Sequence, residues 1–206
     1  LPGADLKSLR AYSLASAPGA TVTDFVIAHV DGGMVSPQLN ALKPGDSINI
    51  TQPASGFFTL DEVPDGDDLW LLSTGTGIGP FLSMLHTEKP WQRFKQINLV
   101  HGVRVAEDLV YQDQIQQWQR QYPEQLRYQP VVTRETIPGA LTERIPQLLE
   151  SGALETALAR PLSVNSQVML CGNPDMISEC RQVLADKGLQ KNTRRRPGNV
   201  TSENYW

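Results

Sequence analysis

The sequence is poor in cysteine and histidine and has no long apolar run. Its 206 residues include two cysteines and three histidines. Two thiols are too few for a disulfide framework, and the spacing of Cys171 and Cys180 fits no common zinc or iron–sulfur pattern. Because the histidines are scattered, we expect no metal site. No stretch approaches the ~18 consecutive apolar residues of a membrane-spanning helix, and we expect the protein in a reducing compartment, the cytoplasm.

An excess of positive charge is also absent. The chain has 18 Lys and Arg against 22 Asp and Glu, which gives a formal net charge of −4. Nucleic-acid-binding domains are usually strongly basic, so no nucleic-acid partner is expected. The opening stretch LPGADLKSLR has no initiator Met and lacks the basic start and apolar segment of a signal peptide. We therefore expect a fragment or a processed chain.

Two styles of sequence meet near residue 65. The first part contains short β-like runs separated by turn signals, at residues 9–16, 22–30 and 47–53. These runs predict antiparallel β-structure with too few strands to close a barrel. The second part alternates continuous apolar strands with helical stretches, which predicts a parallel sheet covered on both faces. We expect a partial antiparallel β domain at 1–65 and an α/β domain at 66–206.

The strands and helices of the second part follow one another regularly. Strands are predicted at residues 69–73, 97–103, 126–133 and 166–171. Helices are predicted at residues 80–88, 108–122, 141–152 and 175–188. In the second of these helices, Tyr111, Ile115, Trp118 and Tyr122 form one apolar stripe. Ligands of such sheets bind outside the carboxyl ends of the strands, so the segments that follow the strands form the candidate site.

A glycine-rich loop follows the first of these strands. Gly75, Gly77 and Gly79 alternate with other residues and precede Pro80, which is favoured near the start of a helix. Residues without a Cβ allow close approach of a phosphate, and a helix amino terminus favours an anion. The spacing G-x-G-x-G matches neither the usual dinucleotide fingerprint nor a Walker loop, so a tight strand–helix turn without a ligand is the alternative.

Three arginines follow the carboxyl ends of the second and third strands. Arg104 and Arg134 end their strands, and Arg144 opens the next segment. Sites for NAD often place Asp or Glu after the second strand, whereas Arg suits the 2′-phosphate of NADP. Guanidinium groups bind phosphate through two parallel hydrogen bonds. Each arginine alone could be a solvated surface residue, but their shared location favours NADP.

Three motifs stand in order along the chain: RAYS (10–13), GTGIGP (75–80) and CGNPDM (171–176). Together they resemble the ferredoxin–NADP reductase family. The stretches GFFTLDEVP, RRRPG and the chain end ENYW resemble its bacterial flavodoxin/ferredoxin–NADP reductases. The resemblance covers essentially the whole chain. Family members begin with further strands before RAYS, about forty residues, and these strands close the flavin barrel.

The resemblance implies an FAD-dependent oxidoreductase that transfers electrons between NADP(H) and ferredoxin or flavodoxin. Hydride transfer to flavin N5 would be followed by one-electron steps to the carrier. Residues 1–65 would form a partial FAD-binding β-barrel, and 66–206 an NADP-binding α/β domain whose carboxyl-terminal tail contacts the flavin. We expect a monomer, with Arg194, Arg195 and Arg196 as a basic patch for the acidic carrier. The alternatives are a flavin reductase component of an oxygenase system and a non-catalytic nucleotide-binding module.

The resemblance also assigns the residues that bind FAD. Arg10 would pair with the pyrophosphate, Tyr12 would stack on the isoalloxazine, and Ser13 would hydrogen-bond near N5. The remaining FAD-binding positions are Ala11, Val26, Ile27, Ala28, His29, Met34, Val35, Ser36, Thr76, Tyr205 and Trp206.

The NADP-binding positions lie in the second part of the chain. They are Gly75, Gly77, Val103, Arg104, Arg134, Arg144, Gly172, Asn173 and Asp175. Tyr12, Ser13 and Cys171 form the expected catalytic set, in which Cys171 is a soft wall beside the reacting rings and not a nucleophile. His101, at the end of a strand, is interpreted as a packed histidine.

Overall fold

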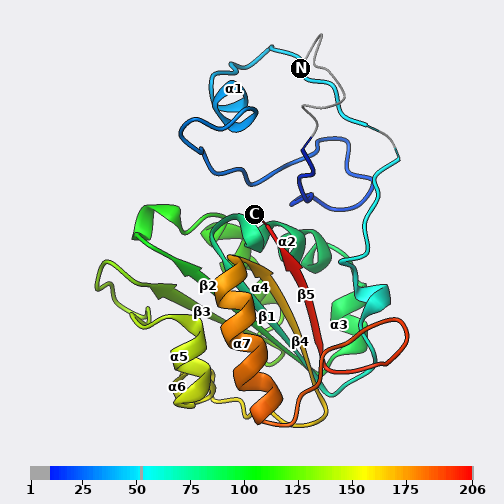
Figure 1. Cartoon of the computed structure of the whole chain (residues 1–206), viewed down its shortest axis with the longest axis vertical. Helices are drawn as coiled ribbons and strands as arrows, with labels where there is room; N and C mark the ends of the chain where they lie inside the picture. Colours follow the sequence, from blue (N-terminus) through cyan, green and yellow to red (C-terminus); the bar gives the residue numbers. More distant parts are fainter. Residues whose placement is uncertain (1–9, 52, 206) are drawn as a thin grey trace.

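The computed structural model describes residues 10–51 and 53–205. Its main body is a five-stranded sheet with helices on both faces. A largely irregular segment, the described residues between 10 and 56, lies above the carboxyl ends of the strands (Figure 1). We call it the upper segment. The site described below lies between this segment and the sheet.

The sheet has the strand order β3-β2-β1-β4-β5, and all neighbouring strands are parallel. Its strands are β1 (Asp68–Thr74), β2 (Gln96–Val103), β3 (Leu126–Val132), β4 (Ser166–Gly172) and β5 (Val200–Asn204). The chain runs outward from β1 to β3 and then returns to β4 on the other side of β1. The strand order therefore reverses between β1 and β4, and ligands bind at such reversals in open parallel sheets.

Two hydrophobic cores lie on opposite faces of this sheet. One face carries α2 (Gly79–Leu85), α3 (Lys89–Arg93) and α4 (Gln112–Gln121), and the other carries α5 (Ile145–Glu150), α6 (Ala153–Leu158) and α7 (Pro174–Asp186) (Figure 1). Because successive strand side chains point to opposite faces, Leu69 and Leu71 join the first core and Trp70 and Leu72 the second. The predicted α/β domain with a parallel sheet is confirmed.

Several elements depart from the predicted ones. The elements β5, α3 and α6 were not predicted. β5 is a polar edge strand that pairs only with β4, and the two helices are short, so neither has a clear apolar pattern. α4 begins only at Gln112, since Tyr111 has a left-handed φ of 58°. α5 begins at Ile145, since Leu141 pairs with Val131 beside β3. Short 3₁₀ turns are η2 (Leu60–Glu62), η3 (Gly75–Ile78) and η4 (Ala106–Asp108).

The expected strands of the upper segment are not formed among its described residues. Antiparallel pairing there is limited to one bridge, between Leu14 and Phe25, and the regular element is the helix α1 (Ser36–Asn40). Several apolar side chains of the predicted strands remain exposed, at Val22, Val30, Ile48 and Ile50, whereas Ala15 is buried in the first core. Strands need neighbours for their backbone groups and a buried face for their side chains, and among the described residues of this segment such pairing is confined to the stretch around Leu14 and Phe25.

Two glycines bring the carboxyl ends of β1 and β4 into backbone contact. A Cβ on Gly77 would lie 2.5 Å from the carbonyl oxygen of Cys171, and a Cβ on Gly172 would collide with Thr74. Gly172 also has a φ of +130°, which side-chain-bearing residues rarely adopt. Gly77 is therefore required for this packing, and its expected role in the approach of NADP stays a prediction.

We expect Gly172→Ala to lower the free energy of unfolding by about 2 to 4 kcal/mol, because it adds both a collision and backbone strain. Gly79→Ala is the matched control, since a Cβ there would make only ordinary contacts of 3.8 Å and longer. Urea unfolding followed by circular dichroism measures both. Equal stability of the two variants would contradict the packing role of Gly172.

Candidate functional site

A cavity of about 1380 Å³ lies between the upper segment and the carboxyl ends of the strands. The upper segment lines it with residues 10–13, 26–31 and 33–36. The opposite wall comes from the ends of β1, β2, β3 and β5, from residues that directly follow β2, β3 and β4, and from the starts of α5 and α7. Its volume exceeds the ~300–1,000 Å³ of ordinary ligand pockets, so the cavity is large enough for an extended ligand or more than one.

The predicted FAD positions of the upper segment share this cavity. Those that line it are Arg10, Ala11, Tyr12, Ser13, Val26, Ile27, Ala28, His29, Met34, Val35 and Ser36. Two side chains hold the loop locally: Ser36 Oγ accepts from the Val30 backbone N–H at 3.1 Å, and His29 Nε2 lies 3.1 Å from an Asp31 carboxylate oxygen. Their roles toward FAD stay predictions. Trp206 lies outside the described residues.

The glycine loop presents one open glycine to the cavity. Gly75 has a φ of +52°, and no atom lies within 4 Å of where its Cβ would be. Gly75 and Thr76 line the cavity, and η3 then leads into α2. Pro80 lies in the first turn of α2, as predicted from its preference for that position. Among the three glycines of the loop, Gly75 is the one that lines the cavity with open space at its Cβ position.

His101 forms a hydrogen bond with the glycine loop. It is fully buried on β2, and its Nε2 lies 2.9 Å from the carbonyl oxygen of Gly75. A carbonyl oxygen only accepts, so Nε2 carries the hydrogen and Nδ1 does not. Nδ1 has no hydrogen-bond partner among the described residues. Burial lowers the pKa of His101 from 6.5 to about 4, so the ring is neutral near pH 7, which agrees with a packed histidine.

The three predicted arginines converge on the same cavity. Arg104, Arg134 and Arg144 all line it, together with Val103. A backbone hydrogen bond of 2.9 Å from Arg134 N–H to the Arg104 carbonyl fixes the first two side by side. Arg144 instead donates to Glu179 of α7 at 2.6 Å, and both of these side chains are substantially exposed. The same wall also carries the carboxylates of Asp108, Asp175, Glu179 and Glu203, and one of its guanidinium groups is paired with one of them.

The end of β4 positions a polar pair. Asn173 caps α7: its Oδ1 accepts from the backbone N–H groups of Asp175 and Met176 at 2.8 and 3.2 Å. Asn173 and Asp175 line the cavity, whereas Gly172 and Cys171 do not. Cys171 is fully buried, and burial raises the pKa of its thiol. The thiol therefore stays protonated behind the wall, which fits no nucleophilic role.

A contact between the two parts of the chain involves a residue that the sequence did not single out. Ser13 Oγ donates to Glu203 Oε2 of β5 at 3.3 Å. Glu203 is about half-buried, and desolvation raises the pKa of its carboxyl. Tyr205, whose backbone N–H donates to the Gly172 carbonyl at 3.1 Å, lines the cavity beside Glu203. The only sequence signal for Glu203 is its place in ENYW, because β5 was not predicted.

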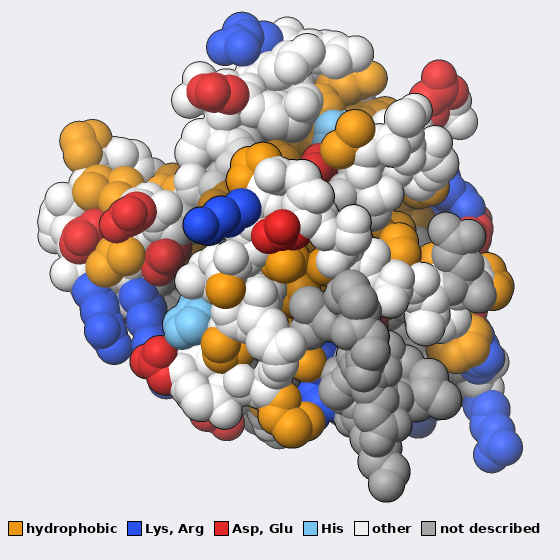
Figure 2. Space-filling view, turned by 90° about the horizontal axis from the view of Figure 1, so that it is seen from above, with side chains coloured by type: hydrophobic (Ala, Val, Ile, Leu, Met, Phe, Trp, Pro, Cys, Tyr) orange, Lys and Arg blue, Asp and Glu red, His pale blue; other side chains and the backbone are white. Residues whose placement is uncertain are grey.

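Charged side chains are mixed over the outer surface around this site. Figure 2, viewed from the side of the upper segment, shows charges of both signs among hydrophobic and uncharged groups. In the described part of the chain, no group of His, Cys, Asp and Glu could hold a metal ion, and no helix is long and apolar enough to cross a membrane.

The fold and this site define a nucleotide-binding oxidoreductase domain. The family model for the oxidoreductase NAD-binding domain matches residues 71–182. Flavodoxin/ferredoxin–NADP reductases of Shigella flexneri and Escherichia coli K12 are 48% and 47% identical to this chain, each over 96% of it and 80% of the relative. The chain belongs to the flavodoxin/ferredoxin–NADP reductase family.

A solved structure agrees with this assignment. The ferredoxin NADP⁺ reductase of Neisseria gonorrhoeae, with bound FAD and NADP, superposes with a TM-score of 0.86 at 36% identity, over 96% of this chain and 80% of that one. The ferredoxin–NADP reductase of Azotobacter vinelandii is 34% identical over 88% of this chain and 73% of the relative. The predicted family and fold are thereby confirmed.

The pKa of His101 predicts a pH-dependent loss of stability. Below pH 6.5 His101 is protonated in the unfolded state, whereas in the folded state it stays neutral down to about pH 4. The free energy of unfolding therefore falls as the pH falls through this window. The shift corresponds to on the order of 3 kcal/mol. His101→Gln keeps a donor for Gly75 and does not titrate.

Urea unfolding from neutral pH down to about pH 4 measures the effect, and wild type should lose on the order of 3 kcal/mol more than His101→Gln. The exposed His29→Gln is the control and should follow wild type. Parallel losses in wild type and His101→Gln would show that His101 is not held neutral.

Proposed function

We propose that the protein is an FAD-dependent oxidoreductase that transfers electrons between NADP(H) and ferredoxin or flavodoxin. The observation that carries this proposal is one cavity with two different walls. The RAYS motif and residues 26–36 line one wall, and three arginines with an open glycine line the other. Family membership, with relatives that carry this activity in their names, supports the same function.

The residues of the cavity fit both cofactors. For FAD, Arg10 offers a guanidinium for the pyrophosphate, Tyr12 an aromatic ring for stacking, and Ser36 closes the loop beneath. For NADP, Gly75 leaves open space near the pyrophosphate, and Arg104 and Arg134 supply cationic donors for the 2′-phosphate. When bound, FAD would supply the redox chemistry: it exchanges a hydride with NADP(H) and single electrons with a carrier protein.

The chain's own groups then orient the reacting rings and exclude water. Ser13 holds its hydroxyl hydrogen toward Glu203, whose carboxyl has a pKa raised by desolvation. Tyr205 borders the cavity above the buried Cys171. We retain Tyr12, Ser13 and Cys171 as the proposed catalytic set, with Cys171 acting only through packing.

The partner, the compartment and the domain boundary belong to the same proposal. An acidic ferredoxin or flavodoxin, a monomeric state and a cytoplasmic location remain our assignment, and the two free buried thiols, Cys171 and Cys180, agree with a reducing compartment. We place the boundary between the FAD-binding part, 1–65, and the NADP-binding part, 66–206, just before β1. An oxygenase reductase component and a non-catalytic module are the competing functions.

A visible spectrum of the full-length protein tests the function. We expect a bound yellow flavin that bleaches on anaerobic addition of NADPH and recovers its colour when oxidised flavodoxin is added. Bound flavin without bleaching would instead support a non-catalytic module. Bleaching by NADPH without transfer to flavodoxin or ferredoxin would support the oxygenase component.

Coenzyme preference tests the cationic wall. Arg134→Gln should weaken NADPH binding about tenfold to hundredfold, because a charge-assisted hydrogen bond to phosphate contributes about 1.5–3 kcal/mol. NADH binding should change little, since NADH lacks the 2′-phosphate. Isothermal titration with NADP⁺ and NAD⁺, which differ by the same 2′-phosphate, measures the two affinities. Arg120→Gln on the exposed surface of α4 is the control. Equal weakening of both coenzymes would argue against 2′-phosphate recognition.

A further inference from the structure

The upper segment is joined to the sheet by a short connection, residues 57–66, which we call the linker. It contains η2 and leads directly into β1. Leu60 and Val63 of the linker are each only 4% exposed and belong to the first core. The ring of Phe58 lies 5.8 Å from that of Phe81 in α2. The linker is therefore a packed part of the structure and not a loose tether.

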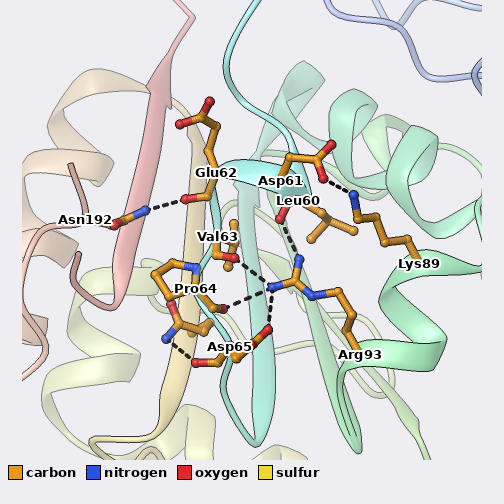
Figure 3. Close-up of polar contacts among 10 residues, drawn as sticks. Leu60, Asp61, Glu62, Val63, Pro64, Asp65, Lys89, Arg93 and Asn192 are labelled. Atoms are coloured by element: carbon orange, nitrogen blue, oxygen red, sulfur yellow. Dashed lines mark hydrogen bonds and ion pairs between the residues drawn. The ribbon is translucent and has the colours of Figure 1, made fainter. Parts of the chain in front are cut away.

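Arg93, the last residue of α3, binds the linker at several points at once. Its Nη1 donates to the carbonyl oxygen of Leu60 at 2.6 Å, and its Nη2 donates to that of Val63 at 2.7 Å (Figure 3). Nη2 also lies 3.3 Å from the Pro64 carbonyl and 3.2 Å from an Asp65 carboxylate oxygen. The Arg93 side chain is only 22% exposed, so most of these contacts are shielded from water.

The opposite edge of the linker is held by the segment before β5. Asn192 Nδ2 donates to the Glu62 carbonyl at 2.6 Å (Figure 3). Arg194 pairs with the Glu62 carboxylate at 3.0 Å and lies 3.9 Å above the ring of Phe57. Arg194, expected to serve in a carrier-docking patch, is thus already engaged within the chain. The linker is therefore hydrogen-bonded on one side by Arg93 and on the other by Asn192 and Arg194.

The Arg93 side of this grip is connected to the glycine loop. α2 begins directly after η3, and Trp91 Nε1 of α3 donates to the carbonyl of Leu85, the last residue of α2, at 3.0 Å. Gln125, which precedes β3, donates to the carbonyls of Trp91 and Phe94 at 2.8 and 2.6 Å. Arg93 therefore connects the linker to the helical layer that follows the glycine loop.

We propose that Arg93 is a positioning residue that fixes the upper segment, and with it the FAD wall of the cavity, relative to the NADP wall. This inference rests on the proposed function. The linker is the covalent path between the walls. The two parts also touch through the side-chain hydrogen bond of 3.3 Å from Ser13 to Glu203 and through Ala15, which is buried in the first core. A planar guanidinium spans separated acceptors in a fixed geometry, whereas a lysine ammonium is a point charge.

The step that depends on such positioning is hydride transfer between the bound rings. Misplacement by about 1 Å can slow a reaction by about a hundredfold, even when the mutated residue is far from the chemistry. The residues proposed to bind the phosphate groups of the coenzyme lie on the NADP wall. Loss of Arg93 should therefore slow flavin reduction without weakening the coenzyme complex. A general loss of stability would not produce this pattern at temperatures where the variant is folded.

The test compares Arg93→Gln, Arg93→Lys and the control Arg120→Gln in the full-length holoenzyme. Stopped-flow reduction by saturating NADPH should be about tenfold to hundredfold slower in Arg93→Gln and intermediate in Arg93→Lys. The dissociation constant for NADP⁺ should stay within about twofold of wild type in all three. Should Arg93→Gln not fold, Arg93→Lys decides the question by itself.

A second readout is independent of activity. Spin labels on Val22→Cys and Val164→Cys, which replace side chains 70% and 69% exposed, report the distance between the upper segment and the α/β domain. The native thiols are buried. The distance distribution should be narrow in wild type and Arg120→Gln, and broadened or shifted in the Arg93 variants.

Unchanged distances and reduction rates in the folded Arg93 variants would overturn the proposal. A rate loss accompanied by an equal loss of NADP⁺ affinity would also overturn it, because the NADP wall would then be damaged. If wild type itself shows no NADPH-dependent flavin reduction, the proposed function fails first, and the label distances still report whether Arg93 fixes the upper segment.

Discussion

The close approach of two strand ends is the constraint on which the site depends. β1 and β4 are neighbours at the reversal of strand order, and the backbone around Gly77 rests directly on that of Cys171 and Gly172. This contact sets where the glycine loop leaves the sheet and where Asn173 starts α7. Because backbone against backbone leaves no room for a Cβ, the geometry tolerates little variation. The open glycine, Gly75, faces the cavity as a consequence.

The protonation states of groups in the site depend on burial as well as on neighbouring charges. A mildly acidic chain gathers Arg104, Arg134 and Arg144 on one wall, together with several carboxylates, so guanidinium donors for an anion lie there beside acidic neighbours. Beneath that wall, desolvation keeps His101 neutral and Cys171 protonated. Neither adds charge to the cavity, so the guanidinium groups and the carboxylates that face them determine its field.

Much of the α/β domain was predictable because parallel strands covered on both faces read as continuous apolar runs. β1 and β4 have that pattern. β5 does not, because an edge strand with polar residues is stabilised by pairing with β4 and not by its own sequence. For the same reason Glu203 could not be placed in advance. In the upper segment the alternating pattern was present, yet Val22 and Ile48 remain exposed because no sheet is available to bury them.

The sequence by itself determined the alternation of strands and helices, the turn after β1 and the family, because these depend on local periodicity and on motifs of fixed spacing. The tertiary structure alone decided which glycine faces the cavity, that Arg144 pairs with Glu179, and that Arg93 reaches the linker. The last two contacts join residues about thirty positions apart in the chain, and no local pattern encodes the meeting of such distant side chains. Their proximity arises when the sheet and its helices pack.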